Sequence, residues 1–257
     1  MAVHSTALVA AGARLADDVE IGPYTLIGPQ VTIGAGCRIA GHVVITGRTT
    51  LGRNNRVFQF ASLGDEPQDK KYQGEDTALV IGDGNTIREM CTINRGTVQG
   101  GGTTRLGDDN WLMACVHVAH DCQVGDHTIF ANNAAIAGHV SIGDYAIISG
   151  YSLVHQFCVV GAHSLLSFGS HINQSVPPYV VVSSDKAKPR GVNVEGLKRR
   201  GYSAAQIARL RRAYRLIYRD KLPLDELRTA LDELAAEGAE IEPLIAFFAA
   251  PERSILR

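Results

Sequence analysis

The sequence predicts a mainly β protein, in which a parallel β-helix spans residues 1–185 and an α-helical domain spans residues 186–257. Three observations predict this class. Apolar residues recur every six positions through most of the chain, glycine is abundant at 27 residues, and aromatic residues make up only 6%. Short strands, tight turns and a thin aliphatic core account for all three.

The six-residue period is the main signal for the β-helix. It differs from the 3.6-residue helical period and from simple strand alternation, and it is the spacing of hexapeptide repeats. One hexapeptide cannot bury its apolar residue alone, so the repeats must stack, with three repeats in each 18-residue coil. The repeated positions are Val3, Val9, Leu15, Ile21, Ile27, Ile33, Ile39, Ile45, Leu51, Val57, Leu63, Ile81, Ile87, Ile93, Leu106, Leu112, Val118, Val124, Phe130, Ile136, Ile142, Ile148, Val154, Val160, Leu166 and Ile172.

Two segments interrupt this period and are expected to form loops, at about residues 64–80 and 94–105. The first is polar (64-GDEPQDKKYQGE-75), and the period resumes in phase at Ile81. The second is rich in glycine (96-GTVQGGGTTR-105), and the period resumes one residue out of phase at Leu106.

The repeats are expected to end at 176-VPPYVVVSS-184, because proline cannot donate a hydrogen bond to a strand ladder. Helix signals follow. Ser203 and Gln206 have the spacing of a capping box. Apolar residues at helical spacing then predict one helix with Ile207, Leu210, Tyr214 and Ile217 on one face, a second with Leu224, Leu227, Leu231 and Leu234, and a third from about Pro243.

Cysteine usage and hydropathy indicate a cytoplasmic protein. The five cysteines are odd in number and contain no CxxC pair, which argues against a disulfide framework or a cysteine zinc site. The N-terminal sequence MAVHSTALVA lacks the basic and apolar regions of a signal peptide. No apolar stretch approaches the roughly 18 residues of a membrane span.

Charge is unevenly distributed along the chain. The net charge is only −1, yet residues 186–219 contain many lysines and arginines and a single acidic residue, Glu195. A basic surface of this kind suits an acidic or phosphate-bearing partner. Nucleic acid is not the expected partner, because no aromatic interleaving or nucleic-acid-binding motif accompanies the charge.

The 18-residue period predicts which polar residues meet. Val118, Ile136 and Val154 are one coil apart, so the residues that follow them should form columns about 4.8 Å apart. The arithmetic places His120, Gly138 and Gln156 in one column, His139 above Asp121, and His155 one column over.

This cluster suits acyl transfer to a hydroxyl group. His120 could remove the hydroxyl proton as a general base, and Asp121 could orient the imidazole or stabilise its charged form. The Gly138 N–H could stabilise the oxyanion of the intermediate. No cofactor and no metal is expected in this interpretation.

Two alternatives remain open at this point. Some hexapeptide proteins that resemble γ-type carbonic anhydrases bind zinc through three histidines, for which His117, His120 and His139 are candidates. A non-catalytic trimeric scaffold is the other alternative, in which the turn histidines only decorate the surface.

Several motifs, spread over essentially the whole chain, are specific enough to indicate a protein family. They are 94-NRGTVQGGG-102, 117-HVAHDCQVG-125, 131-ANNAAIAGHVSIG-143, 154-VHQFCVVGAH-163 and 191-GVNVEGLKRRG-201. With these motifs the sequence resembles the acyl-carrier-protein–UDP-N-acetylglucosamine O-acyltransferases. The resemblance implies a left-handed β-helix and a homotrimer with sites between subunits. It also implies transfer of an (R)-3-hydroxyacyl group from the 4'-phosphopantetheine of acyl carrier protein to the 3-hydroxyl of UDP-N-acetylglucosamine, which begins lipid A synthesis.

The resemblance also implies roles for individual residues. His120 matches the general base, Asp121 its partner and Gly138 the oxyanion donor. The residues that match substrate contacts are Gln68, Asp69, Lys71, His117, His139, His155, Gln156, Asn193, Glu195, Arg199 and Arg200. The arginines of residues 209–219 could attract the acidic acyl carrier protein.

Two positions depart from the family pattern. Asn94 stands where histidine is expected, which puts a secondary contact in question. Phe168 stands where glycine admits a long acyl chain in some members, so its ring should shorten the groove. A medium chain of roughly ten to twelve carbons is therefore expected.

Overall fold

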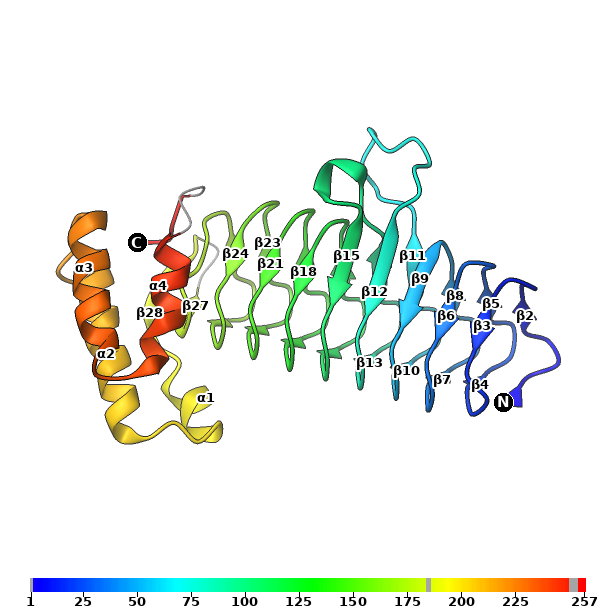
Figure 1. The fold of residues 1–257 in the computed structure, drawn as a ribbon, viewed down its shortest axis with the longest axis horizontal. Coiled ribbons are helices and arrows are strands. Elements are labelled where there is room, and N and C mark those ends of the chain that lie inside the picture. The colour runs from blue at the N-terminus through cyan, green and yellow to red at the C-terminus, as the bar shows by residue number, and fades with distance from the viewer. Residues whose placement is uncertain (1, 184–185, 250–253) are drawn as a thin grey trace.

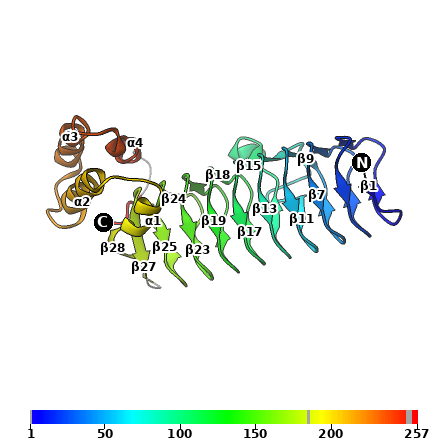
Figure 2. The same cartoon turned by 90° about the horizontal axis from the view of Figure 1, so that it is seen from below.

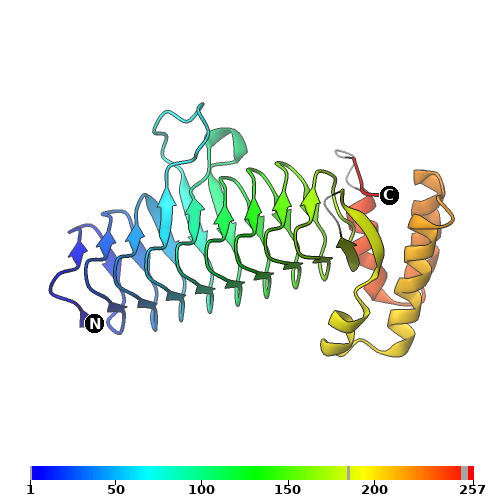
Figure 3. The same ribbon diagram turned by 180° about the vertical axis from the view of Figure 1, so that it is seen from behind.

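The computed structural model describes residues 2–183, 186–249 and 254–257, and its main body is a parallel β-helix with three sheets. Figures 1 and 3 show the coils stacked into an elongated prism with the N-terminus at one end. Each strand from β1 to β26 contains one residue of the six-residue period, so the repeat assignment is confirmed along its whole length.

The strands fall into three sheets, named here A, B and C. Sheet A contains β1 (Ala2–Val3), β4 (Glu20–Ile21), β7 (Arg38–Ile39), β10 (Arg56–Val57), β13 (Thr86–Ile87), β16 (Trp111–Leu112), β19 (Ile129–Phe130), β22 (Ile147–Ile148), β25 (Leu165–Leu166), β27 (Val180–Ser183) and β28 (Lys188–Val192). Sheet B contains β2 (Leu8–Val9), β5 (Leu26–Ile27), β8 (Val44–Ile45), β11 (Ser62–Asp65), β14 (Thr92–Asn94), β17 (His117–Val118), β20 (Ala135–Ile136), β23 (Leu153–Val154) and β26 (His171–Ile172). Sheet C contains β3 (Arg14–Leu15), β6 (Thr32–Ile33), β9 (Arg48–Leu51), β12 (Ala78–Ile81), β15 (Thr103–Leu106), β18 (Gln123–Val124), β21 (Ser141–Ile142) and β24 (Val159–Val160).

From β4 onwards, the second residue of each two-residue strand is buried in the prism, and all of these residues except Phe130 are aliphatic. The register follows the 18-residue period: Val118 pairs with Ile136, and Ile136 pairs with Val154. Every such contact joins nearest coils only, which is why a sequence period predicts the stacking so well.

Both insertions leave the prism at the same edge, where the chain passes from sheet B to sheet C. The first connects β11 to β12, and the second, which contains the 3-10 helix η1 (Val98–Gly100), connects β14 to β15. Figure 1 shows both projecting together from one side of the prism. At the edge between sheets C and A the coils remain continuous, because Asn85 and Asn110 donate their backbone N–H groups to the side-chain oxygens of Asn55 and Asn85, at 2.9 Å each.

Sheet A extends past the prolines, contrary to the expected end of the ladder. β27 pairs in parallel with β25, although Pro177 and Pro178 precede it, and β28 then pairs antiparallel with β27. The prolines lie in the turn before β27, where no ladder hydrogen bond is needed. The domain boundary expected at residue 185 lies outside the described residues, and the division into two domains remains a proposal.

The C-terminal helices are α1 (Val194–Arg199), α2 (Ala204–Tyr218), α3 (Leu224–Ala235) and α4 (Glu242–Ala249), with a 3-10 helix η2 (Ala239–Ile241) before α4. Figure 2 shows them gathered at the end of the prism opposite the N-terminus. Both hydrogen bonds of the predicted capping box of Ser203 and Gln206 are present at the start of α2. Within the described residues, no helix is long and apolar enough to cross a membrane.

Candidate active site

The edge between sheets B and C, called here the B–C edge, is formed by the turns that join each strand of sheet B to the next strand of sheet C. His120 and Asp121 lie in the turn after β17, and Gly138 and His139 lie in the next turn, after β20. The two insertions occupy the two turns before His120. The period therefore brings together the residues it predicted, beside both loops.

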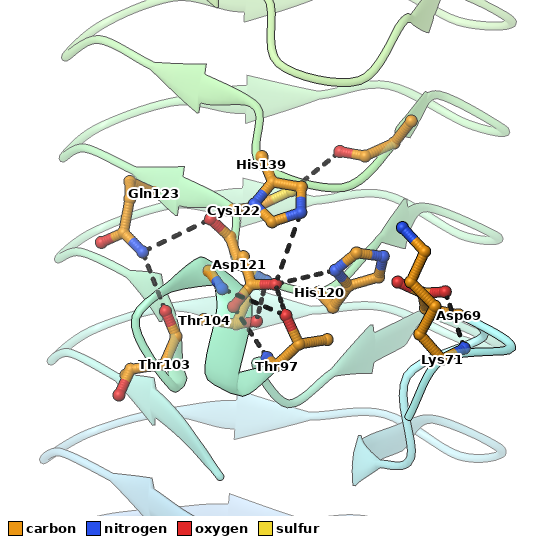
Figure 4. Close-up of polar contacts among 12 residues, drawn as sticks. Asp69, Lys71, Thr97, Thr103, Thr104, His120, Asp121, Cys122, Gln123 and His139 are labelled. Atoms are coloured by element: carbon orange, nitrogen blue, oxygen red, sulfur yellow. Dashed lines mark hydrogen bonds and ion pairs between the residues drawn. The ribbon is translucent and has the colours of Figure 1, made fainter. Parts of the chain in front are cut away.

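His120 and Asp121 form a hydrogen-bonded pair. The His120 Nδ1 lies 2.8 Å from Asp121 Oδ2, with the carboxylate fully buried and the imidazole 14% exposed (Figure 4). A carboxylate oxygen accepts this hydrogen bond when Nδ1 carries the proton, and in the neutral imidazole Nε2 is then the acceptor. This is the tautomer that a general base for a hydroxyl group requires.

Asp121 has further partners that the sequence reasoning missed. Thr97, in the glycine-rich insertion, donates its backbone N–H to Oδ1 at 2.8 Å and its hydroxyl to Oδ2 at 2.6 Å. The Asp121 N–H in turn donates to the Thr104 hydroxyl at 2.8 Å. The only available signal was the threonine within the motif 94-NRGTVQGGG-102.

His139 completes the cluster from the next coil. Its Nε2 lies 3.8 Å from Asp121 Oδ2, and its ring is perpendicular to that of His120 at a centroid distance of 5.1 Å. Asp121 and His139 occupy the same turn position and both have the left-handed backbone, with φ of 61° and 62°. This conformation is uncommon for residues other than glycine, and here the repeated coil geometry imposes it.

Gly138 covers the His120 ring. A Cβ atom at residue 138 would lie 2.5 Å from Cε1 and 2.7 Å from Nε2 of His120, so only glycine fits without displacing the ring. Within the described part of the chain, the Gly138 N–H has no hydrogen-bond acceptor. The residue that packs against the His120 ring therefore also carries a backbone N–H without an acceptor among the described residues.

His117 lies on the outer face of sheet B, in strand β17, which leads directly into the turn that contains His120. Its Nδ1 lies 2.7 Å from the Thr92 hydroxyl. Burial, and secondarily the proximity of His120, lower the pKa of His117. The lowered pKa favours the neutral imidazole, which donates from one ring nitrogen and accepts at the other.

The first insertion carries Gln68, Asp69 and Lys71. Figure 4 shows Asp69 accepting the backbone N–H of Lys71, at 3.0 Å, within this loop. Arg95 stabilises this loop, because its guanidinium donates to the Gly64 carbonyl at 2.9 Å and to the Tyr72 hydroxyl at 3.0 Å.

Asn94 also fastens the first insertion. It is buried, and its side-chain amide donates to the Glu66 carbonyl at 2.9 Å. In this chain Asn94 therefore anchors the start of the loop, whatever a histidine at this position contacts in other family members.

His155 and Gln156 lie on the B–C edge, two turns beyond His120. His155 borders an open groove of about 590 Å³ whose other lining residues are Leu153, Val154, His171, Ile172, Asn173, Gln174, Lys186 and Ala187. The groove lies towards the C-terminal end of the prism, and its lining does not include His120, Asp121 or His139.

Asn193, Glu195, Arg199 and Arg200 do not join this cluster within one chain. Asn193 is the N-cap of α1 and donates to the His163 carbonyl at 2.9 Å, while Arg200 is its C-cap and donates to the Tyr145 carbonyl at 3.0 Å. Tyr145 and His163 lie between sheets C and A. These four residues therefore lie on a different edge of the prism from His120.

His163 is held neutral beneath this group. Its ring stacks between Tyr145 and Tyr179 at 4.9 and 5.4 Å, and its Nε2 lies 3.2 Å from the Tyr202 hydroxyl. Burial, and then the positive charge of Arg200, lower the pKa of His163 to about 4.

This pKa predicts a dependence of stability on pH. Between about pH 6.5 and 4 the unfolded chain binds a proton at His163 that the folded chain does not, so stability falls as the pH is lowered through this window. From pH 7 to pH 5 the melting temperature of the wild type should fall about 3 °C further than that of His163→Phe, which keeps the ring stack. Equal falls in differential scanning calorimetry would contradict the prediction.

Phe168 lies on the third edge, between β25 of sheet A and β26 of sheet B. Its side chain is 72% exposed and meets only the Tyr151 ring, edge-on at 5.6 Å, among the rings of the described residues. The ring does not turn into the coil, so it is available to limit a groove outside the prism.

The one cluster of metal-ligand type found among the described residues is His120, Asp121 and His139, whose candidate ligand atoms lie within 4.8 Å of one another. The zinc set considered from the sequence had His117 in place of Asp121. Asp121 already accepts two hydrogen bonds from Thr97 and one from His120, which the approach of a cation would disrupt. The geometry fits a hydrogen-bonded catalytic pair better than a metal centre.

Comparison with known proteins places this geometry in a family. The profile described as "Bacterial transferase hexapeptide (six repeats)" matches residues 6–47 and 103–138, and that described as "Udp N-acetylglucosamine O-acyltransferase; Domain 2" matches residues 176–256. Two curated relatives named acyl-[acyl-carrier-protein]–UDP-N-acetylglucosamine O-acyltransferase, from Thiobacillus denitrificans and Halorhodospira halophila, are 56% and 52% identical to this chain, over 99% of each sequence. The chain belongs to this family.

Solved structures agree with this assignment. The LpxA of Acinetobacter baumannii matches with a TM-score of 0.97 and 47% identity, over 99% of both chains. The UDP-N-acetylglucosamine O-acyltransferase of Moraxella catarrhalis matches with a TM-score of 0.98 and 44% identity, over 100% of both chains. The family resemblance, the O-acyltransferase class and the left-handed parallel β-helix predicted from the sequence are thereby confirmed.

Proposed function

We propose that this protein transfers an (R)-3-hydroxyacyl group from acyl carrier protein to the 3-hydroxyl of UDP-N-acetylglucosamine, the first step of lipid A biosynthesis, in the cytoplasm. The observation that carries the proposal is the His120–Asp121 pair beneath the free Gly138 N–H, in a chain of this family. This geometry supplies a base and an oxyanion donor, the two groups that direct acyl transfer needs.

In the proposed reaction, His120 Nε2 removes the proton of the sugar hydroxyl while the hydroxyl oxygen attacks the thioester carbonyl. The resulting oxyanion accepts a hydrogen bond from the Gly138 N–H. The intermediate then collapses, the carbon–sulfur bond breaks, and the proton on His120 passes to the departing pantetheine thiolate. Asp121 stabilises the transient imidazolium through its bond to Nδ1, at 2.8 Å.

The sugar nucleotide would be held by residues from two edges of the prism. Gln68, Asp69, Lys71, His117, His139, His155 and Gln156 are expected near the reacting hydroxyl. Asn193, Glu195, Arg199 and Arg200 are expected at the nucleotide and its phosphates, because the guanidinium fork suits a diphosphate.

We propose a homotrimer because no single chain can bring these residues together. A closed ring of identical subunits would set the B–C edge of one chain against the edge with α1 of the next. Light scattering should then give three times the 27.5 kDa mass of the chain. A catalytically active monomer would contradict this arrangement.

Phe168 is expected to select a medium acyl chain of about ten to twelve carbons, because its exposed ring would close the end of the acyl groove. Phe168→Gly should shift the preference towards a fourteen-carbon donor by about tenfold in kcat/KM, with Phe168→Leu intermediate. Competition assays with ten- and fourteen-carbon donors measure the ratio. A wild-type preference for fourteen carbons would contradict the prediction.

Acyl carrier protein is expected to approach the basic helix α2, although several arginines of this helix already form ion pairs within the chain. Arg209 is bonded to Glu240, Arg212 to Glu237 at 2.7 Å, and Arg215 to Asp220 at 3.3 Å. The charge left for steering on this helix and its C-cap therefore belongs mainly to the exposed Arg211 and Arg219.

The direct test offers 3-hydroxyacyl carrier protein and UDP-N-acetylglucosamine to the purified protein. Mass spectrometry should detect the 3-O-acylated sugar nucleotide and free carrier protein. No product with any chain length would contradict the proposal and favour a scaffold. Loss of activity on dialysis against a chelator, with recovery on adding zinc, would favour the zinc alternative.

A further inference from the structure

We propose that Thr97 is a positioning residue, which orients the Asp121 carboxylate and through it the His120 base. The proposal rests on the function proposed above, because it assigns a role within the same site. The residue lies in the second insertion, outside the hexapeptide repeats, so neither the period nor the columns point to it.

The Asp121 carboxylate is fully buried, so its oxygens need hydrogen-bond donors from the protein. Thr97 supplies two of them, its backbone N–H to Oδ1 and its hydroxyl to Oδ2. The His120 ring supplies a third, also to Oδ2. A single residue of the insertion thus contacts both oxygens and fixes the plane of the carboxylate.

The direction of the Thr97 hydroxyl is determined by its surroundings. Its oxygen accepts the backbone N–H of Gly100 at 3.2 Å, as the cap of η1. Its hydrogen is directed to Asp121, because a carboxylate can only accept. Thr97 is almost completely buried, so water does not compete for these bonds.

The insertion is shaped for this close approach. A Cβ atom at Gly100 would lie 2.0 Å from the Asp121 Cγ, so a side chain at this position would collide with the carboxylate. The loop therefore packs directly against Asp121 on the side away from His139. Figure 4 shows Thr97, His120 and His139 converging on the same carboxylate.

The hydroxyl is needed because two imidazoles face Oδ2. His120 Nδ1 lies 2.8 Å from this oxygen, and His139 Nε2 lies 3.8 Å from it. Without Thr97, a small rotation of the carboxylate would transfer the hydrogen bond at Oδ2 from His120 to His139. With the carboxylate held by Thr97, His120 keeps its proton on Nδ1 and presents a free Nε2 beneath Gly138.

The test compares Thr97→Val, which removes the hydroxyl at nearly constant shape and keeps the backbone N–H, with Thr97→Ser, which keeps the hydroxyl. Thr97→Val should lower kcat about tenfold and change the KM for UDP-N-acetylglucosamine less than about twofold. Thr97→Ser should restore kcat to within about threefold of wild type. The full-length protein is used throughout.

A second readout does not depend on catalysis. In protein labelled with ¹⁵N-histidine, the His120 signals of the wild type should show the Nδ1-protonated tautomer, and those of Thr97→Val should show a mixture. Thr104→Val is the matched control, because Thr104 bonds the Asp121 backbone without touching the carboxylate. Its tautomer should match that of the wild type.

Three results would overturn the proposal: wild-type kcat and tautomer in Thr97→Val, a change in KM alone, or the same tautomer mixture in Thr104→Val. If Thr97→Val does not fold, Thr97→Ala replaces it, because alanine also lacks a side-chain donor, and a wild-type kcat and tautomer in Thr97→Ala would overturn the proposal. If the wild type transfers no acyl group, the proposed function fails, but the tautomer comparison still decides the role of Thr97.

Discussion

His120→Ala should transfer acyl groups about 10²–10⁴-fold more slowly than the wild type, because it lacks the group that removes the hydroxyl proton. The loss should appear in kcat, with little change in the KM for UDP-N-acetylglucosamine, since the base acts in the transition state rather than in substrate binding. Steady-state kinetics with a 3-hydroxyacyl carrier protein measure both constants.

The matched control is His127→Ala. His127 also occupies a turn, but it lies on the edge between sheets C and A, where it stacks on Tyr145 at 4.7 Å. This variant should keep wild-type kinetics. Equal rates for His120→Ala and the wild type would end the assignment of His120 as the base, and equal losses in both variants would indicate general damage to the coil.

Gly138→Ala should lower kcat by about 10²–10³-fold, an effect as large as the loss of an oxyanion donor. Alanine keeps the backbone N–H group, but the N–H would be displaced from its working position. The added Cβ would lie 2.5 Å from the His120 ring, so the ring, the turn or both must move. Base and donor would then no longer share one position for the reacting carbonyl. The melting temperature should also fall, because the turn is tightly packed.

A double variant separates this collision from a general effect of alanine on the turn. In His120→Ala with Gly138→Ala the ring is absent, so the melting temperature should recover towards that of His120→Ala alone. The double variant should also transfer acyl groups no more slowly than His120→Ala. A melting temperature that falls additively would show that the collision with His120 is not the cause.

The cluster of His120, Asp121, Gly138 and His139 could be predicted from the sequence because it follows from the 18-residue period. Val118 and Ile136 are one coil apart, so the stacking of Gly138 over His120 and of His139 over Asp121 is a matter of counting. Each coil contacts only its neighbours, and no distant packing can shift this register.

The insertions could not be predicted in this way, because they have no period. Thr97 reaches Asp121, and Arg95 reaches Tyr72, only because two loops of different length fold back on the same edge. The strand after the prolines was missed for a related reason. A proline prevents a hydrogen bond at its own nitrogen, but it does not prevent a ladder from resuming two residues later, as β27 does.

The sequence by itself determined the stacked coils, the column of His120 beneath Gly138, the capping box at Ser203 and the family, because each depends on residues at a regular spacing or in a local motif. Tertiary structure alone decided which groups donate hydrogen bonds to the buried carboxylate of Asp121. It also decided that the residues expected to contact the substrates lie on three separate edges of the prism. The physical reason is the same for both. Hydrogen bonds between segments without a repeat depend on the three-dimensional path of the chain, and no spacing along the sequence encodes that path.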